Sequence, residues 1–353
     1  RPRRERRGRE RAPAADFVFS TVQTLSRPNR LEVFAPEHFD YIVVDESHRA
    51  GAQTYSRFLR HFKPQFLLGM TATPERTDGK DIFQSFDYNT AYEIRLHGAL
   101  KEKMLCPFHY YGIQDVTVDG KVVEDETAFD LLVTEERVKR IIEKLRLYGC
   151  YDGIPRGLIF CSRVKEAQEL SHLFNRSGLP SVALTGNDAP EKREKAIERL
   201  EGDDPEIHYI FTVDVFNEGV DIPLVNQIVM LRPTKSPIIF VQQLGRGMRK
   251  VDDRDKYLTV IDFIGNYENN YMIPMALYGD RSADKDRIRR LLQGKNREIP
   301  GTSTVNFDRI SQKKIFESIN SVRLNRLTAL REEYRALKSR LGRVPMMVDF
   351  LDL

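Results

Sequence analysis

Short apolar runs rich in Val, Ile and Phe alternate along most of the chain with segments whose apolar residues recur every three or four positions. The runs have the length and composition of buried strands, and the intervening segments have the periodicity of helices that bury one face. Strand–helix alternation of this kind folds into parallel sheets that helices cover on both faces. We therefore predict an α/β protein. The predicted strands are residues 17–20, 41–44, 66–70, 157–161, 181–184, 209–213, 227–231 and 258–261.

Helical periodicity is clearest in two of the intervening segments. Residues 135–147 and 164–174 each place apolar side chains at spacings of three and four, so these side chains share one face of a helix. Apolar side chains between Leu327 and Leu341 repeat at the same spacings but span only two heptads. That repeat indicates a packed helix and not a coiled coil.

The composition is that of a soluble protein, because 41% of the 353 residues are hydrophobic and 31% are charged. The longest apolar runs, such as residues 41–44 and 238–241, are far shorter than the roughly 20 residues that span a bilayer. We therefore expect no membrane partner. The cysteines Cys106, Cys150 and Cys161 are widely spaced and fit neither a disulfide framework nor a zinc site. Since the first residues also lack a secretory signal, we expect a reducing, cytoplasmic location.

Positive charge is concentrated at the N-terminus. Residues 1–12 hold seven arginines and two glutamates, a charge of +5, whereas the whole chain carries +4. The rest of the chain therefore carries −1, and the net charge does not indicate a nucleic-acid surface on the folded part. Residues 1–15 have no apolar period, so we predict a disordered Arg-rich tail, with a phosphate-binding arm as the alternative.

Two adjacent carboxylates directly follow one of the predicted strands, in the string Tyr41-Ile-Val-Val-Asp45-Glu46-Ser47-His48. Open parallel sheets bind ligands at the carboxyl ends of their strands. There, Asp45 is suited to hold Mg²⁺ on a nucleoside triphosphate through water, and Glu46 to orient or deprotonate the attacking water. A strand that simply ends in a polar turn is the alternative.

A pair of hydroxyl residues follows the next predicted strand, in the string Met70-Thr71-Ala72-Thr73-Pro74. Thr71 and Thr73 flank an alanine, which suits a hinge that relays the state of a bound nucleotide. The same residues also suit a simple turn.

Two arginines close a further string, Val241-Gln242-Gln243-Leu244-Gly245-Arg246-Gly247-Met248-Arg249. Arg246 and Arg249 are three residues apart, so on a helix they would share a face. Two guanidinium groups on one face can bind a γ-phosphate, and an arginine in this role contributes about 10³–10⁵ in rate in related chemistry. A solvated basic face is the alternative.

In their order along the chain, these strings resemble the motifs of superfamily 2 helicases of the DEAD/DEAH type. Residues 45–48 resemble motif II (Walker B), and residues 20–25 resemble the strand-contacting motif upstream of it. Motifs III, IV, V and VI are matched by residues 71–73, 158–163, 212–223 and 242–249. Residues 66–80, 210–223 and 260–266 are similar to a bacterial subgroup of DNA helicases related to restriction-enzyme motors. In that subgroup an uncharacterised C-terminal domain follows the motor, and a nuclease domain often precedes it. The similarity covers roughly residues 16–275.

The resemblance implies two RecA-like lobes, with ATP and Mg²⁺ as cofactors and DNA as the partner. ATP hydrolysis at the cleft between the lobes would move the protein along DNA. Nucleotide contacts fall on Gly219, Asp221, Gln242, Arg246 and Arg249, with Asp221 near the ribose. Coupling between nucleotide and nucleic acid falls on His48, Thr71 and Thr73. Contacts to the nucleic-acid backbone, which position without reading sequence, fall on Thr21, Gln23, Arg163, Thr185 and Thr212.

The phosphate-binding loop of this family is missing from the sequence. Gly-Lys occurs at residues 79–80, 120–121 and 294–295, and nowhere within the pattern GxxxxGK[ST]. The lysine and the hydroxyl that this loop supplies are therefore absent. Only 44 residues precede Asp45, too few for the strand, loop and helix of the family. A nuclease HxKxxxxD motif also fails, because Leu68 stands where the acid belongs.

We therefore expect a partial first lobe at residues 16–105, a connection at 106–133, a complete second lobe at 134–278, and the start of a mainly α accessory domain at 279–353. The chain is predicted to be a fragment of an ATP-dependent DNA helicase or translocase, an ATP hydrolase whose activity belongs to the full protein. A nuclease domain is possible upstream. Two alternatives stay open: a nucleic-acid-binding module without ATPase activity, and an RNA-directed helicase of the same superfamily.

Overall fold

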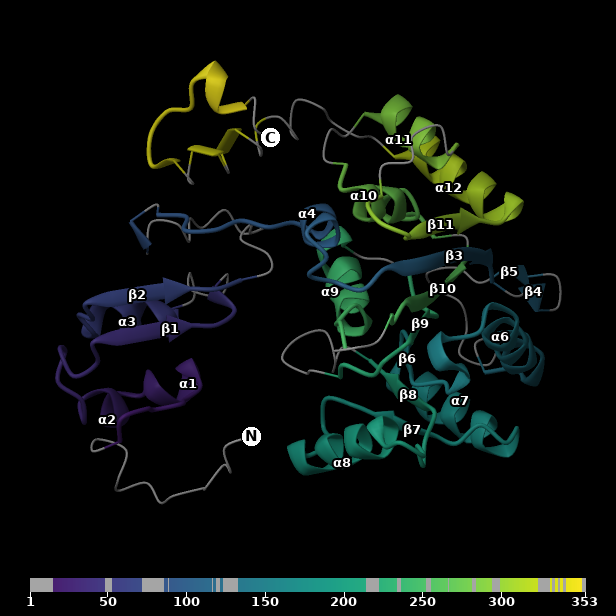
Figure 1. Ribbon diagram of the computed structural model, residues 1–353, viewed down its shortest axis with the longest axis horizontal. Coiled ribbons are helices and arrows are strands. Elements are labelled where there is room, and N and C mark those ends of the chain that lie inside the picture. Colours follow the sequence, from purple (N-terminus) through teal and green to yellow (C-terminus); the bar gives the residue numbers. More distant parts are fainter. Residues whose placement is uncertain are drawn as a thin grey trace. The chain divides into compact units, whose positions relative to one another are not determined.

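The computed structural model divides the chain into two compact units. Unit 1 comprises Arg1–Glu93 with Leu330–Leu353, and unit 2 comprises Ile94–Ala329. Figure 1 shows the helices and strands of each unit. The structure describes residues 15–47, 53–71, 86–87, 89–115, 117–118, 121–122, 133–213, 222–233, 236–251, 255–265, 267–280, 284–293, 299–322, 331, 334–335, 337–338 and 341–350.

Unit 1 contains a parallel pair of strands, β1 (Tyr41–Val44) and β2 (Phe66–Gly69), separated in the chain by helix α3 (Gln53–His61). Alternation along β1 buries Ile42 and Val44 and leaves Tyr41 and Val43 exposed. The buried face packs with Phe58 of α3 into a small apolar core. The short helices α1 (Val22–Leu25) and α2 (Pro28–Leu31) and the 3₁₀ turn η5 (Met347–Phe350) complete the described elements of this unit.

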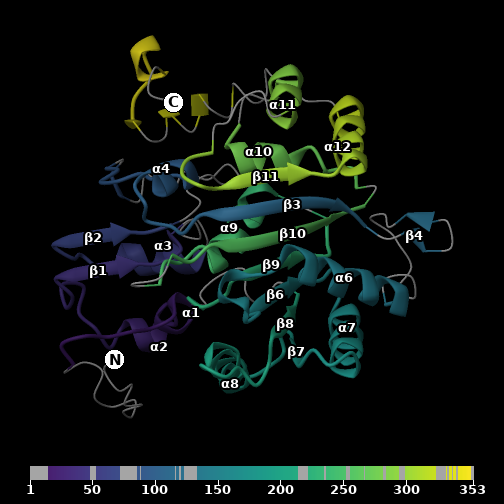
Figure 2. The same cartoon turned by 45° about the vertical axis from the view of Figure 1, so that its right-hand side comes forward.

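Unit 2 is built on a seven-stranded sheet with the strand order β11-β3-β10-β9-β6-β8-β7. Every neighbouring pair in it is parallel (Figure 2). The strands are β3 (Phe108–Gln114), β6 (Gly157–Phe160), β7 (Ser181–Leu184), β8 (Tyr209–Thr212), β9 (Gln227–Met230), β10 (Leu258–Ile264) and β11 (Thr304–Phe307). A separate antiparallel pair consists of β4 (Thr117–Val118) and β5 (Lys121–Val122).

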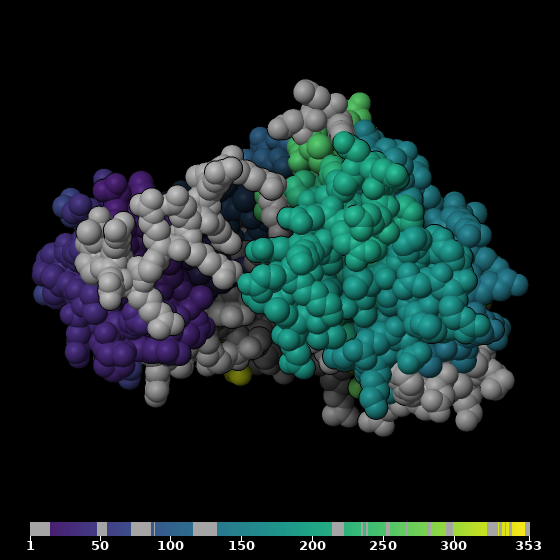
Figure 3. Space-filling model, turned by 90° about the horizontal axis from the view of Figure 1, so that it is seen from below, coloured from purple at the N-terminus to yellow at the C-terminus, as the bar shows by residue number. Residues whose placement is uncertain are grey.

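Helices cover both faces of this sheet, as parallel strands require. On one face an apolar core forms with α6 (Glu135–Tyr148) and α7 (Val164–Arg176). On the other face the core includes residues of α8 (Pro190–Glu201), α9 (Pro237–Gly247), α10 (Met272–Tyr278), α11 (Lys285–Leu292) and α12 (Arg309–Ser321). Helix α4 (Leu96–Lys101) and the 3₁₀ turn η4 (Tyr151–Gly153) are the other elements among the described residues of this unit. In Figure 3 the teal surface belongs to the segment that carries α7 and α8.

Most of the predicted elements are confirmed. Seven of the eight predicted strands and both clearly periodic helices form at the expected places, with ends shifted by a few residues. The prediction of a strand at 17–20 is wrong, because those residues have no regular structure. Among the described residues, no helix is long and apolar enough to cross a membrane.

Two strands were not predicted, and both change how the chain is divided. β3 lies within the expected connection 106–133, yet it pairs with β10 over its whole length. β11 lies within the expected accessory domain 279–353, yet it pairs with β3. Residues Ile288, Leu292, Ile315 and Ile319 of α11 and α12 belong to the core on this side of the sheet. The large sheet therefore draws on segments from both sides of the expected second lobe.

Candidate functional site

The two carboxylates predicted to be catalytic lie where strand β1 ends. Asp45 and Glu46 directly follow Val44, and Thr71 follows the parallel strand β2 by two residues. Two backbone hydrogen bonds join the strand ends, from Met70 N to the Val44 carbonyl and from Ser47 N to the Met70 carbonyl, each 2.9 Å long. The structure therefore brings the motif II and motif III strings together. His48 and Thr73 lie outside the described residues.

Glu46 adopts an unusual backbone conformation. Its φ of 50° lies in the left-handed region, where a residue other than glycine is strained by about 1–3 kcal/mol. Its N–H donates to Asp45 Oδ1 at 2.9 Å, which fixes the turn between the two carboxylates. Strain of this kind concentrates at functional sites, where the surrounding structure holds it in place.

The residues at this strand end fit a bound Mg²⁺. Asp45 is solvent-exposed and presents carboxylate oxygens, the ligand type that Mg²⁺ prefers. Because Mg²⁺ keeps several of its waters, one exposed carboxylate suffices for the protein's share of such a site when a nucleotide supplies phosphate oxygens.

At the nucleic-acid positions predicted in unit 1, Thr21 caps helix α1. Its Oγ1 accepts a hydrogen bond from Thr24 N at 3.3 Å, and both Thr21 and Gln23 are exposed. Their side chains are therefore accessible to a ligand. Their contact with nucleic acid stays a prediction.

In unit 2, Arg163 lies between the end of β6 and the start of α7, and it is exposed. A buried ionic network holds the loop that presents it. Glu166 Oε2 accepts from Ser162 N at 2.9 Å, and Glu166 Oε1 accepts from Arg137 at 3.0 Å. Arg137 in turn makes two hydrogen bonds, of 3.2 and 2.9 Å, to the carboxylate of Asp115. These three charged side chains are fully buried.

The sequence did not reveal this network. Arg137 and Glu166 lie in amphipathic helices among ordinary charged residues, and nothing in their spacing marks them as buried. The two carboxylates raise the pKa of Arg137 above its ordinary value, although burial alone would lower it. The guanidinium therefore stays charged and links helix α6 to the motif IV loop.

The two threonines predicted to face nucleic acid in unit 2 are both buried. Thr185 donates through its N–H and its hydroxyl to Asp188 Oδ2, at 2.7 and 3.0 Å. Thr212 is fully buried at the end of β8, and its hydroxyl has no hydrogen-bond partner among the described residues. The contacts of these two threonines with nucleic acid therefore stay predictions, made for side chains that are buried in this conformation.

The arginine pair is arranged differently from the sequence prediction. Gln242 and Arg246 are four residues apart on α9 and share a face, but α9 ends at Gly247. Arg249 lies beyond the helix and is exposed, so the two arginines do not lie together on a helical face. The helix end packs tightly, because a Cβ on Gly247 would lie only 2.4 Å from Leu258. Gly219 and Asp221 lie outside the described residues.

Comparison with known proteins matches two family models to this chain. The family model "Type III restriction enzyme, res subunit" matches residues 3–76, and "Helicase conserved C-terminal domain" matches residues 136–251. Together the two models match somewhat more than half of the chain. They fall on unit 1 and unit 2 respectively, and they include most of the strings described above.

Two curated relatives have similar sequences. The helicase candidate IRC3 of Saccharomyces cerevisiae is 26% identical over 76% of this chain and 40% of its own length. The type I restriction enzyme EcoAI endonuclease subunit of Escherichia coli is 24% identical over 72% of this chain and 36% of its own length. The chain thus spans less than half of either relative.

Two solved structures share the fold. A fragment of an HsdR subunit of a type I restriction enzyme from Vibrio vulnificus has a TM-score of 0.52 and 23% identity, covering 67% of this chain and 45% of its own. The type ISP restriction-modification enzyme LlaBIII has a TM-score of 0.56 and 20% identity, covering 86% of this chain and 24% of its own. The two solved structures show a shared fold. The matched family models and the curated relatives place the chain among the superfamily 2 helicases, in the group that resembles restriction-enzyme motors.

Proposed function

We propose that this chain is part of an ATP-dependent DNA helicase or translocase, in which ATP hydrolysis is coupled to movement on DNA. The observation that carries the proposal is the position of Asp45 and Glu46. They lie at the carboxyl end of a parallel strand and are hydrogen-bonded through Ser47 and Met70 to the segment that carries Thr71. The two matched helicase models support the same activity.

In the proposed reaction Asp45 would hold Mg²⁺, which when bound would neutralise charge on the phosphates of ATP. Glu46 orients the attacking water and takes its proton. Arg246 and Arg249 stabilise the charge that develops on the γ-phosphate. Gln242, Gly219 and Asp221 contact the nucleotide, and His48, Thr71 and Thr73 relay its state.

DNA is the proposed track. The restriction enzymes among the similar proteins support it, and LlaBIII is described as bound to DNA. Thr21, Gln23 and Arg163 are the exposed candidates for contacts to the sugar–phosphate backbone. An RNA-directed motor is the competing proposal, because proteins named as RNA helicases also have similar sequences.

We further propose that other residues of a longer protein complete the first lobe and supply the phosphate-binding loop. One face of the β1–β2 sheet exposes Tyr41 (72%), Val43 (58%) and Phe66 (50%). Parallel sheets are ordinarily covered on both faces, so this face is suited to pack against further structure. The chain spans less than half the length of each relative, which also supports the proposal that a longer protein supplies these residues.

A nucleic-acid-binding module without ATPase activity is the second candidate. The lack of any GxxxxGK[ST] string in the sequence favours it. The two candidates differ in what the full-length protein does with ATP.

The test is ATP turnover by the full-length protein with single-stranded DNA, duplex DNA or RNA. We expect turnover that DNA stimulates more than RNA does. Stimulation by RNA alone would mean that the protein moves along RNA and not along DNA. DNA binding without any turnover would support the binding module and contradict the motor.

A further inference from the structure

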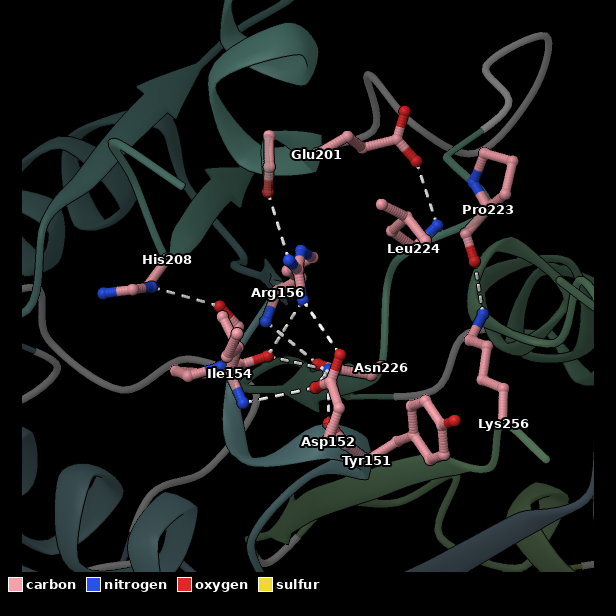
Figure 4. Close-up of polar contacts among 12 residues, drawn as sticks. Tyr151, Asp152, Ile154, Arg156, Glu201, His208, Pro223, Leu224, Asn226 and Lys256 are labelled. Carbon is pink, nitrogen blue, oxygen red and sulfur yellow. Dashed lines mark hydrogen bonds and ion pairs between the residues drawn. The ribbon is translucent and has the colours of Figure 1, made fainter. Parts of the chain in front are cut away.

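The ammonium group of Lys256 is buried and contacts the backbone of both segments predicted to bind nucleotide in unit 2. Lys256 is only 3% exposed. Its Nζ donates three hydrogen bonds to backbone carbonyls: to Pro223, to Gly247 at 2.8 Å and to Arg249 at 3.0 Å. The contact with Pro223 is visible in Figure 4. An ammonium has three donors, and each of these three carbonyls accepts from it.

The three carbonyls belong to two segments that are far apart in the sequence. Gly247 is the last residue of α9, and Arg249 follows it by two residues. Pro223 comes two residues after Asp221 and ends the motif V string. Lys256 therefore ties the backbone of Arg249 to the end of the segment that carries Asp221.

A second charged side chain holds the same peptide group from its other side. Glu201, the last residue of α8, accepts from Leu224 N at 2.9 Å through Oε1. The Pro223–Leu224 peptide thus has its carbonyl bound by a cation and its N–H bound by a carboxylate (Figure 4). Charge-assisted hydrogen bonds on both ends fix the orientation of a peptide plane more firmly than neutral ones.

The surrounding residues hold this clamp in place. Arg156 Nη2 donates to the Gly202 carbonyl at 3.1 Å, which fixes the end of α8 just after Glu201. Asn226 donates to the carbonyls of Tyr151 and Ile154, at 3.0 and 2.8 Å, which fixes the chain just after Leu224. At the α9 end, Cys106 N donates to the Met248 carbonyl at 2.9 Å. All these contacts lie within unit 2.

Burying an ammonium group is costly, since the loss of hydration costs several kcal/mol unless hydrogen bonds and charge replace it. The carbonyls at a helix C-terminus carry partial negative charge and offset part of that cost. An apolar residue at this position would carry no such cost of lost hydration, so packing alone does not explain why a lysine is buried here. The lysine therefore suits a role in orienting the two segments.

We propose that Lys256 is a positioning residue for ATP hydrolysis: it fixes the chain around Arg249 relative to the segment that ends at Pro223. Glu201 completes the clamp on the Pro223–Leu224 peptide. This inference rests on the proposed function, because it assigns Lys256 a task only if Arg249 acts on the nucleotide.

The test is a double-mutant cycle on DNA-stimulated ATP turnover in the full-length protein. Lys256→Met removes the three hydrogen bonds, and Arg249→Ala removes the guanidinium that Lys256 is proposed to position. A misplacement of about 1 Å costs on the order of 10²-fold in rate. We therefore expect Lys256→Met to lower kcat by about 10- to 100-fold in the wild-type background. In the Arg249→Ala background it should lower kcat by less than about threefold, because the two residues act as a unit.

Two controls separate positioning from general destabilisation. Lys195→Met removes an exposed lysine from the outer face of α8 and should leave kcat unchanged. Glu201→Ala leaves the Leu224 N–H without its acceptor and should lower kcat, whereas Glu201→Gln keeps an acceptor oxygen and should restore most of it. If Lys256→Met fails to fold, the comparison of Glu201→Ala with Glu201→Gln tests the positioning proposal instead.

The outcomes distinguish this inference from the proposed function. If wild-type protein does not hydrolyse ATP, or Arg249→Ala turns over ATP at the wild-type rate, the proposed function fails and this inference fails with it. If Arg249→Ala is impaired but Lys256→Met lowers kcat equally in both backgrounds, Lys256 acts independently of Arg249 and only this inference is wrong. It is equally overturned if Glu201→Ala and Glu201→Gln have the same kcat.

Discussion

Arg249 is the residue whose position the sequence predicted least well. Its spacing from Arg246 suggested one helical face, but α9 ends at Gly247, where the backbone packs against Leu258. A close approach between a helix and a strand depends on the tertiary structure, so spacing alone could not reveal it. Arg249 remains a candidate for contacting the γ-phosphate, because that assignment does not require it to lie within the helix.

We predict that Arg249→Ala lowers DNA-stimulated ATP turnover on the order of 10³-fold while DNA affinity changes little, because the guanidinium acts on the phosphate and not on DNA. Steady-state ATPase assays and DNA titrations of the full-length protein measure the two effects. Equal losses of turnover and affinity would instead assign Arg249 to the DNA track.

Nothing in the sequence marks Asp262 as a buried carboxyl. It is buried on β10 and accepts a hydrogen bond from the Tyr110 hydroxyl at 2.6 Å. Burial raises the pKa of its carboxyl from the ordinary 3.8 to about 7, and the hydrogen bond from Tyr110 opposes part of that rise. The native state therefore retains a proton that the unfolded chain releases above about pH 4.

Between about pH 4 and pH 7, this carboxyl makes the native state less stable as pH rises, because the native state must give up its proton at a higher pKa than the unfolded chain. Asp262→Asn removes the titration and keeps an acceptor for Tyr110. We expect the stability of the variant relative to wild type to increase with pH over this range, by a few kcal/mol in total. Urea unfolding at several pH values measures it. Parallel pH profiles for the two proteins would contradict the raised pKa.

Among the elements, helix α12 is connected to the end of strand β3 by the side chain of Asp308, in addition to its packing against the sheet. Asp308 caps α12, with Oδ1 accepting from Ser311 N at 2.7 Å. Its Oδ2 accepts from Gln114 N, also at 2.7 Å, at the end of β3. The same carboxylate therefore starts a helix and connects it to a strand almost two hundred residues earlier in the chain.

We predict that Asp308→Ala lowers the free energy of unfolding of unit 2 by about 2–3 kcal/mol, because it removes a helix cap and a charge-assisted hydrogen bond to a partly buried N–H. Asp284→Ala is the matched control. Asp284 caps α11 by accepting from Asp286 N and Arg287 N, so we expect a loss of about 1 kcal/mol. Chemical denaturation of both variants makes the comparison, and equal losses would argue against the second role of Asp308.

Much of the element order could be predicted from the sequence, because buried strands such as Gly157–Phe160 are continuous apolar runs and helices such as α6 have a clear period. β3 could not, since its tyrosines, histidine and glycine resemble a connecting segment. β11 is short and half exposed, and only its pairing with β3 shows it to be a strand. In the candidate site, residue type and spacing singled out Asp45, Glu46 and Arg246, and their roles stay predictions. The burial of Thr185 and Thr212 and the Arg137 network depend on contacts between distant segments.

In the whole molecule, the compact units formed by residue contacts have different boundaries from the domains predicted from the motifs. Unit 2 comprises Ile94–Ala329 and so extends beyond the second lobe predicted at residues 134–278. The added segments contribute β3, β11, α11 and α12, whose apolar residues form part of one face of the core.

We therefore expect a protein of residues 94–329 to fold by itself and to unfold cooperatively, whereas a protein of residues 134–278 does not. The shorter protein would expose the apolar face that β3 and α12 cover, since Val260 and Ile264 are buried in that core. Circular dichroism during thermal unfolding distinguishes the two. A cooperative transition for 134–278 would favour the boundaries set by the motifs.

The proposed ATP hydrolysis depends on the carboxylates at the end of β1. The most direct measurement is ATP turnover by the full-length protein and its Glu46→Gln variant, with DNA present, alongside ATP binding by both. We predict that the variant binds ATP nearly as well as wild type but hydrolyses it at least about 10²-fold more slowly, because Gln cannot take the proton of the attacking water. Turnover at the wild-type rate by Glu46→Gln would contradict the assignment of this site.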